Sequence, residues 1–138
     1  MDNKFYSQKA YIKRTGISSA KEDTLEMIFR LCSANGYARI SDIAQNLNVS
    51  VSSVSKTAAS MKESGFIDYK KYGIITLTPE GRLRGKYLLK RHDIINKFFC
   101  FINNSENELV LTEQIEHYFD EKTVQNLEDL LAKLITNL

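Results

Sequence analysis

Cysteine and histidine are scarce in this chain of 138 residues, which contains two of each, a single proline and no tryptophan. Cys32 and Cys100 stand far apart and outside any CxxC pattern, which excludes a disulfide-dense secreted framework and a cysteine-based zinc site. We therefore expect a reducing, cytoplasmic environment. No apolar run approaches the roughly 18 residues of a membrane span, and the N-terminus lacks the apolar stretch of a signal peptide, so no membrane partner is expected.

Charge is plentiful but unevenly distributed along the sequence. The length suits about one domain, and 26% charged with 43% hydrophobic residues is typical of a soluble globular protein. Residues 1–92 contain 16 Lys and Arg against 8 Asp and Glu, whereas residues 93–138 contain 3 against 9. The net charge of +2 thus combines a basic part, which could face phosphates, with an acidic part, which could hold cations or form a solvated surface.

The pattern after an N-terminal arm predicts a helix-turn-helix. A first helix is expected from Ser19, its N-cap, to Asn35-Gly36, because apolar residues recur at three- and four-residue steps. A short helix opening at Ser41 follows, and then a turn at Asn48. Ser50 is the expected cap of a second helix, whose outer face is rich in serine and lysine.

The next segment, FIDYKKYGIITLTPEG, has β character. Two short strands joined by a turn at Tyr72-Gly73 predict a β-wing, so that residues 19–78 are expected to form a winged helix-turn-helix. Thr78 and Pro79 are typical of a helix start, here of a long helix.

The remaining sequence predicts helices throughout. The long helix is expected to extend to about Asn103, followed by a helix through LVLTEQIEHYF and a last helix from about Asp120 to Asn137. Residues 79–138 thus form a helical region, and the fold class is mainly α with a small β-wing.

The run EQIEH holds two carboxylates and an imidazole. On a helix, Glu113, Glu116 and His117 would share one face and could converge on a metal ion. Asp23 and Glu26, on the first predicted helix, are also three residues apart. Such acidic residues are common on helices and usually solvated, which is the alternative interpretation. The H-E-x-x-H motif is absent, which argues against a hydrolase.

From Ser19 to its C-terminus the chain resembles the metal-dependent repressors related to the diphtheria toxin repressor, and most closely their manganese transport regulator branch. The segments that carry the resemblance are GYARISDIAQNLNVSVSSVSK, YKKYGIITLTPEG, GKYLLKRH and EQIEH. The resemblance implies a winged helix followed by a helical metal-binding and dimerisation domain over residues 79–138, without the SH3-like third domain of longer members. It also implies that the chain is not an enzyme but a transcriptional regulator, a repressor of metal-ion uptake genes, which binds operator DNA as a homodimer.

The resemblance further implies a set of six metal ligands that includes both histidines of the chain. These residues are Asp23, Glu26, His92, Glu113, Glu116 and His117. Iron-responsive relatives have methionine and cysteine where Asp23 and Glu113 stand, and replacing sulfur by carboxylate favours Mn²⁺. The four carboxylates carry a charge of −4 when ionised, which favours two Mn²⁺ ions per subunit. Metal is expected to tie the first helix to the later ones, and so to fix the dimer for two half-sites on DNA.

DNA contacts are expected from the second helix of the motif and from the wing. The candidates are Ser50, Val51, Ser52, Ser53, Lys56, Lys62, Lys70 and Lys71. Family members usually carry proline where Val51 stands, so the preferred target sequence is left open. Each lysine could instead be a solvated surface charge. The arm over residues 1–18, which is basic, could touch DNA, support the dimer or be disordered.

Other functions compatible with the sequence are a winged-helix regulator that lacks a metal switch, one that responds to Fe²⁺ or Zn²⁺, a metal-buffering protein, and a small helical dimetal enzyme. The winged helix argues against an enzyme. A second argument is that the metal uses all six ligand-type residues, so that no base, nucleophile or loop for a small organic substrate is left over. A buffering protein would not need the serine-rich helix.

Overall fold

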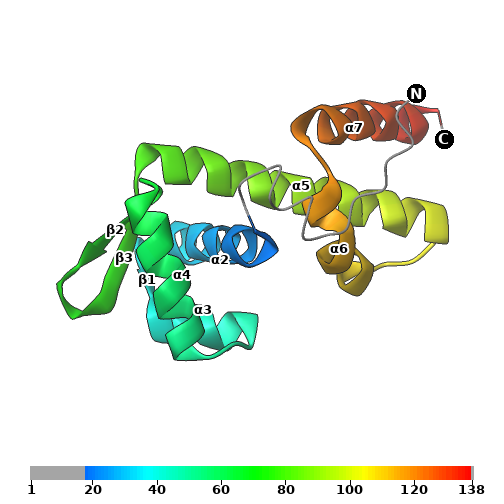
Figure 1. The fold of residues 1–138 in the computed structure, drawn as a ribbon. Coiled ribbons are helices and arrows are strands. Elements are labelled where there is room, and N and C mark those ends of the chain that lie inside the picture. Colours follow the sequence, from blue (N-terminus) through cyan, green and yellow to red (C-terminus); the bar gives the residue numbers. More distant parts are fainter. Residues whose placement is uncertain (1–17, 138) are drawn as a thin grey trace, which may run out of the picture. The chain divides into compact units, whose positions relative to one another are not determined.

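The computed structural model describes residues 18–137, so the predicted arm, apart from Ser18, lies outside the described residues. The chain divides into two compact units, of which the first ends at Gly85 and the second begins at Lys86. The elements in chain order (Figure 1) are α2 (Ser19–Asn35), β1 (Ala38–Arg39), α3 (Ile40–Leu47), α4 (Val51–Glu63), β2 (Ile67–Lys70), η1 (Lys71–Gly73), β3 (Ile74–Leu77), α5 (Pro79–Asn103), α6 (Leu109–Ile115), η2 (Glu116–Tyr118) and α7 (Glu121–Thr136).

Helix α2 begins one residue earlier than the sequence predicts. Its N-cap is Ser18, whose backbone is extended and whose Oγ accepts a hydrogen bond from the Lys21 amide at 3.2 Å. Two adjacent serines both fit the cap pattern, and only the backbone conformation distinguishes them. The predicted C-terminus is confirmed, because Gly36 adopts φ +85 and its amide donates to the Cys32 carbonyl at 2.8 Å.

The helix-turn-helix consists of α3 and α4. Helix α3 begins at Ile40 rather than Ser41, because the preceding Ala38–Arg39 is a strand that leads directly into it. Asn48 ends α3 in the left-handed conformation, with φ 55 and ψ 47, as its role in the turn requires. Ser50 caps α4 as predicted, since its Oγ accepts from the Ser53 amide at 3.1 Å.

The sheet has three antiparallel strands in the order β1-β3-β2, one more than the predicted hairpin. Ala38 pairs with Ile75, and Ile67 pairs with Leu77. The missed strand has two residues, which is too short to show the alternation of polar and apolar residues that reveals a strand. The wing tip turns through η1, where Tyr72 adopts a left-handed φ of 67°.

Within the described residues, the N-terminal unit packs α2, α3, α4 and the sheet around buried apolar side chains. These are Leu25, Ile28, Cys32, Ile43, Val54, Ala58, Met61, Ile67 and Ile75. The start of α5 belongs to this unit and approaches it closely: a Cβ added at Gly81 would lie 1.8 Å from the Phe66 carbonyl oxygen. Gly85 likewise lies against Phe29, whose Cβ would be 2.7 Å from the added atom. The sequence thus needs glycine at both positions.

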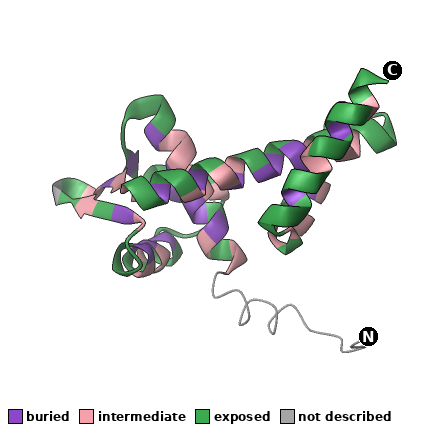
Figure 2. Cartoon of the chain, turned by 90° about the horizontal axis from the view of Figure 1, so that it is seen from above, coloured by how far each residue is buried: buried purple, intermediate pink, exposed green. Residues whose placement is uncertain are grey.

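The C-terminal unit has a smaller core, built between α5 and α7. Ile94, Val124 and Leu131 are buried there, with Phe98 and Leu127 packed against them. Buried and exposed residues alternate along the longest helix in Figure 2. Among the helices of residues 18–137, none combines the length and the apolar character that crossing a bilayer requires.

Candidate metal and nucleic-acid sites

In the N-terminal unit, the two predicted ligands lie on α2. Asp23 is exposed, and Glu26 is half-buried. Arg30, one turn further along the helix, donates from Nη2 and Nε to the Glu26 Oε2 at 2.9 and 3.1 Å. Glu26 is therefore paired with a cation of its own helix.

In the C-terminal unit, α5 and η2 bring His92 and Glu116 into direct contact. His92 Nδ1 lies 2.7 Å from Glu116 Oε2, and the two side chains are among the most buried polar groups of the described residues. Burying a carboxylate costs free energy unless an opposite charge or a hydrogen-bond donor compensates for the lost water. Here the imidazole of His92 is that partner. This is the environment in which a carboxylate and an imidazole can serve as ligands without competition from bulk water.

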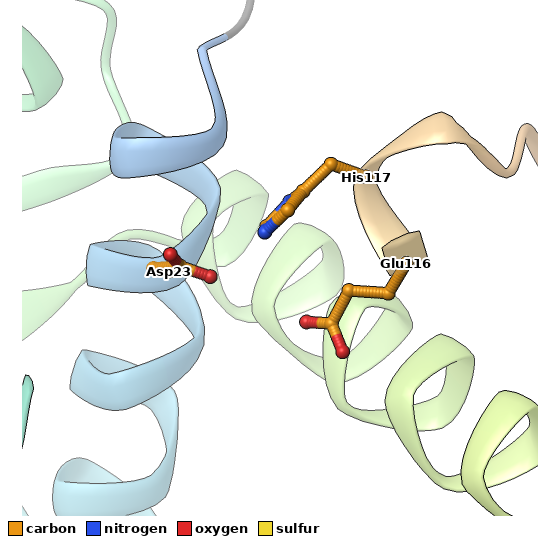
Figure 3. A group of neighbouring side chains, drawn as sticks. All are labelled: Asp23, Glu116 and His117. Carbon is orange, nitrogen blue, oxygen red and sulfur yellow. The ribbon is translucent and has the colours of Figure 1, made fainter. Parts of the chain in front are cut away.

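The EQIEH run is not one continuous α-helix. Helix α6 ends at Ile115, and Glu116 and His117 lie in the 3-10 turn η2. The side chains of Glu116 and His117 leave this short segment together (Figure 3), and one potential ligand atom of each lies within 4.8 Å of the other. Glu113 is exposed and joins no cluster of potential ligands among the described residues. That all three residues converge on one metal ion therefore stays a prediction, and the change from α-helix to 3-10 helix after Ile115 places Glu113 in a different element from the other two.

Arg91 is a residue of this region that the sequence prediction missed. Its side chain is 3% exposed, and its guanidinium donates to the Phe119 carbonyl and to His117 Nδ1, both at 3.4 Å. Its position next to His92 is no specific signal, because basic residues beside a histidine are common. An arginine is buried almost only when it is paired, and these two contacts supply partners for Arg91.

The donor set fits a divalent cation of hard character. Carboxylate oxygens and imidazole nitrogens are the ligand types of all six predicted positions. Neither cysteine takes part: Cys32 is buried, and burial raises the pKa of its thiol, although the nearby Arg82 opposes this. Cys100 is half-buried on α5, where its Sγ lies 3.8 Å from Asn96 Oδ1.

All of the predicted DNA-contacting residues whose side chains are described are exposed on the N-terminal unit. Exposed side chains at the start of α4, along it and on the wing are Ser50, Val51, Ser52, Ser53, Lys56, Lys62 and Lys70. The side chain of Lys71 lies outside the described part. Arg39, before α3, and Tyr72, which is 89% exposed at the wing tip, are also exposed but were not among the predicted DNA contacts.

The chain matches two family models that together span most of its length. Residues 9–75 match the iron dependent repressor N-terminal DNA binding domain, and residues 78–137 match the iron dependent repressor metal binding and dimerisation domain. It is 37% identical over 117 residues to the HTH-type transcriptional regulator MntR of Lysinibacillus sphaericus (strain C3-41), covering 84% of each chain. It is also 37% identical over 111 residues to the regulator of the same name from Geobacillus kaustophilus (strain HTA426), covering 80% of this chain and 79% of the relative.

A solved structure, described as that of the manganese regulator SloR, has a similar fold. It aligns with a TM-score of 0.72 at 24% sequence identity, over 81% of this chain and 53% of the SloR chain. The present chain thus spans about half the length of that protein, and the likeness concerns the fold.

Proposed function

The chain belongs to the iron-dependent repressor family, and from this membership we propose that it is a Mn²⁺-activated transcriptional repressor of metal-ion uptake genes. Residues 19–78 bind operator DNA in this proposal, and residues 79–138 bind metal and form the homodimer. The relatives are named as transcriptional regulators, in agreement with the prediction that the chain is not an enzyme.

The buried His92–Glu116 pair is the observation that carries the metal proposal. The Nδ1 to Oε2 distance of 2.7 Å brings two ligand-type groups from α5 and η2 together. His117 follows directly in η2, with its ligand atom within 4.8 Å of that of Glu116. A divalent ion would be held by these three residues together with Asp23 and Glu26 of α2.

Manganese is favoured over softer ions by the absence of sulfur from the ligand set. Carboxylates and imidazoles suit Mn²⁺, although affinity alone favours later metals of the series, so availability in the cell also decides. The names of the relatives support the same metal. Four carboxylates, Asp23, Glu26, Glu113 and Glu116, would balance the charge of two divalent ions, and Glu113 would complete the second site from its exposed position.

Metal binding would act on DNA affinity through α2. The bound ion supplies positive charge that neutralises the carboxylates and holds their helices together. Asp23 and Glu26 lie on the helix that also contributes Leu25 and Ile28 to the core of the N-terminal unit. Drawing this helix onto the ligands of α5 and η2 would restrict the spacing of the two DNA-binding units in a dimer. Metal affinity and DNA affinity would then be reciprocally coupled.

A homodimer is supported by apolar side chains that the C-terminal unit leaves exposed. Phe101 and Ile102 at the end of α5, and Leu109 and Val110 at the start of α6, are between 38% and 74% exposed. Exposed apolar residues grouped along adjoining segments are typical of an interaction surface. The two-fold symmetry of such a dimer would match two half-sites of an operator.

The experiment that tests the proposal is DNA binding measured during titration with several metals. The probe is a fluorescent duplex from the promoter of a metal-uptake transporter of the same genome, with a scrambled duplex as control. We expect Mn²⁺ to raise affinity for the promoter duplex at least about tenfold, which corresponds to a coupling typical of allosteric proteins. A stronger response to Fe²⁺ or Zn²⁺ would contradict the choice of metal, and equal affinity with and without every metal would contradict the switch.

A further inference from the structure

Arg91 contacts the imidazole ring of His117, one of the proposed metal ligands. The Arg91 Nη2 lies 3.4 Å from His117 Nδ1, and both residues belong to the C-terminal unit. The guanidinium is almost completely buried, and it also donates to the Phe119 carbonyl two residues further along the chain. Arg91 therefore contacts the segment that carries Glu116 and His117 at two points.

The neutral imidazole of His117 cannot accept this hydrogen bond from Arg91 and bind a metal ion at the same time. An arginine can only donate hydrogen bonds, so Nδ1 of His117 must be the acceptor, and the proton of the neutral ring is then on Nε2. A neutral imidazole has a single nitrogen lone pair for either an acceptor role or a metal bond. A metal at Nδ1 would take the lone pair that Arg91 uses, and a metal at Nε2 would require a proton on Nδ1, facing the arginine donor.

We propose that Arg91 is a built-in competitor of the metal: it holds His117 in the metal-free protein and must leave this ring when a divalent cation binds there. The inference rests on the proposed function, since it takes His117 to be a ligand. It goes further by assigning a role to a residue that donates no ligand atom. The buried positive charge of Arg91 acts in the same direction, because it opposes a second cation nearby.

The hydrogen bond from Arg91 to the Phe119 carbonyl can remain when Arg91 releases His117. The carbonyl of Phe119 follows η2, so a guanidinium bound there still ties this segment to α5. Metal binding would thus exchange one hydrogen bond of Arg91 without freeing the whole segment.

The first test measures the tautomer of His117 in the metal-free wild-type protein. Long-range ¹⁵N–¹H correlation spectra distinguish the two ring nitrogens, and the chain has only one other histidine, so assignment is direct. We expect an unprotonated Nδ1 and a protonated Nε2 at His117. A ring protonated at Nδ1 would overturn the proposal, and this measurement needs no variant that could fail to fold.

The second test compares Arg91→Met with Lys90→Met by calorimetric titration with Mn²⁺. Lys90 is the preceding residue of α5 and carries the same charge, but it pairs with Glu128 of α7 at 3.3 Å, and Glu128 is not one of the proposed ligands. We expect Arg91→Met to bind Mn²⁺ about fivefold more tightly than the wild type, the gain from one hydrogen bond that no longer has to break. Lys90→Met should bind like the wild type.

The outcomes separate this inference from the proposed function. Wild-type protein that binds no Mn²⁺ would contradict the proposed function itself. Wild-type binding, with unchanged or weaker binding by a folded Arg91→Met protein, would contradict only the role of Arg91. If Arg91→Met does not fold, Arg91→Lys replaces it, a variant that keeps the charge but not the forked donor. Arg91→Lys should bind Mn²⁺ more tightly than the wild type. Unchanged or weaker binding would again contradict the proposal.

Discussion

His92 Nδ1 and Glu116 Oε2 lie 2.7 Å apart, and both side chains are withdrawn from solvent, with 6% and 2% exposure. They come from α5 and η2, 24 positions apart in the sequence. A buried carboxylate that loses its charge or its partner leaves the other group unsatisfied. The pair therefore fixes α5 and η2 to each other through a buried contact of their own side chains.

Glu116→Gln should weaken Mn²⁺ binding by more than about tenfold, because it replaces a charged ligand by a neutral amide of the same size at the centre of the proposed site. Isothermal titration with Mn²⁺ measures the effect. Glu106→Gln, at an exposed position between α5 and α6, is the matched control and should bind like the wild type. Equal affinities for Glu116→Gln and wild type would remove Glu116 from the ligand set.

Glu113→Cys should shift the metal response of DNA binding towards Fe²⁺, because a thiolate at this position replaces a hard ligand by a soft one. The ratio of the Fe²⁺ and Mn²⁺ concentrations needed for half-maximal DNA binding under anaerobic conditions measures the shift. Glu113 is exposed, so the change should leave the fold intact. An unchanged ratio would mean that Glu113 does not ligate, and that the selectivity has another source.

Lys56→Gln should weaken DNA binding while leaving the melting temperature unchanged, because Lys56 is exposed on α4. A lost phosphate contact lowers affinity for all sequences alike and reduces the slope of log K against log salt concentration by about one. Fluorescence anisotropy over a series of salt concentrations measures both quantities. Lys133→Gln, on α7 of the C-terminal unit, is the control and should keep the wild-type slope.

The sequence predicts the fold well where a single local signal decides. Pro79 after Thr78, Gly36 after α2 and Ser50 before α4 each fix a helix end through their own backbone or side chain. It fails where a non-local partner decides. The strand β1 exists because Ala38 and Arg39 pair with β3, and two residues carry no pattern of their own.

The same distinction applies to the candidate site. Residue types and the resemblance indicate His92, Glu116 and His117, but no local pattern reveals that η2 breaks the helix before Glu116. The role of Arg91 is also hidden, because its contacts to His117 and Phe119 join α5 to residues 26 and 28 positions away. Basic residues beside a histidine are too common for their spacing to signal such contacts.

Gly81→Ala should destabilise the protein, although alanine normally favours a helix over glycine by about 0.5–1 kcal/mol. The new Cβ would lie 1.8 Å from the Phe66 carbonyl oxygen and 3.2 Å from Leu77 Cδ2, so the start of α5 must move away from the loop after α4. Such overpacking costs about 1–3 kcal/mol, and a backbone obstacle places it at the upper end. Thermal unfolding measures the loss, and a melting temperature equal to or above the wild type would contradict this packing.

The N-cap of α7 should make stability depend on pH in the acidic range. Asp120 Oδ1 accepts a hydrogen bond from the Thr123 amide at 2.8 Å, and the hydrogen bonds from Thr123 lower the pKa of this carboxyl in the folded protein. A carboxyl with a lower pKa in the folded state stabilises that state at pH values above its unfolded pKa of about 4, and this stabilisation is lost as the pH falls through the folded pKa. An asparagine side chain caps a helix without titrating, so Asp120→Asn should narrow the fall in melting temperature between neutral and acidic pH. Asp68→Asn, at an exposed position of β2 outside any helix cap, should leave that fall closer to the wild type. Identical pH profiles for Asp120→Asn and wild type would show that the cap does not contribute through its charge.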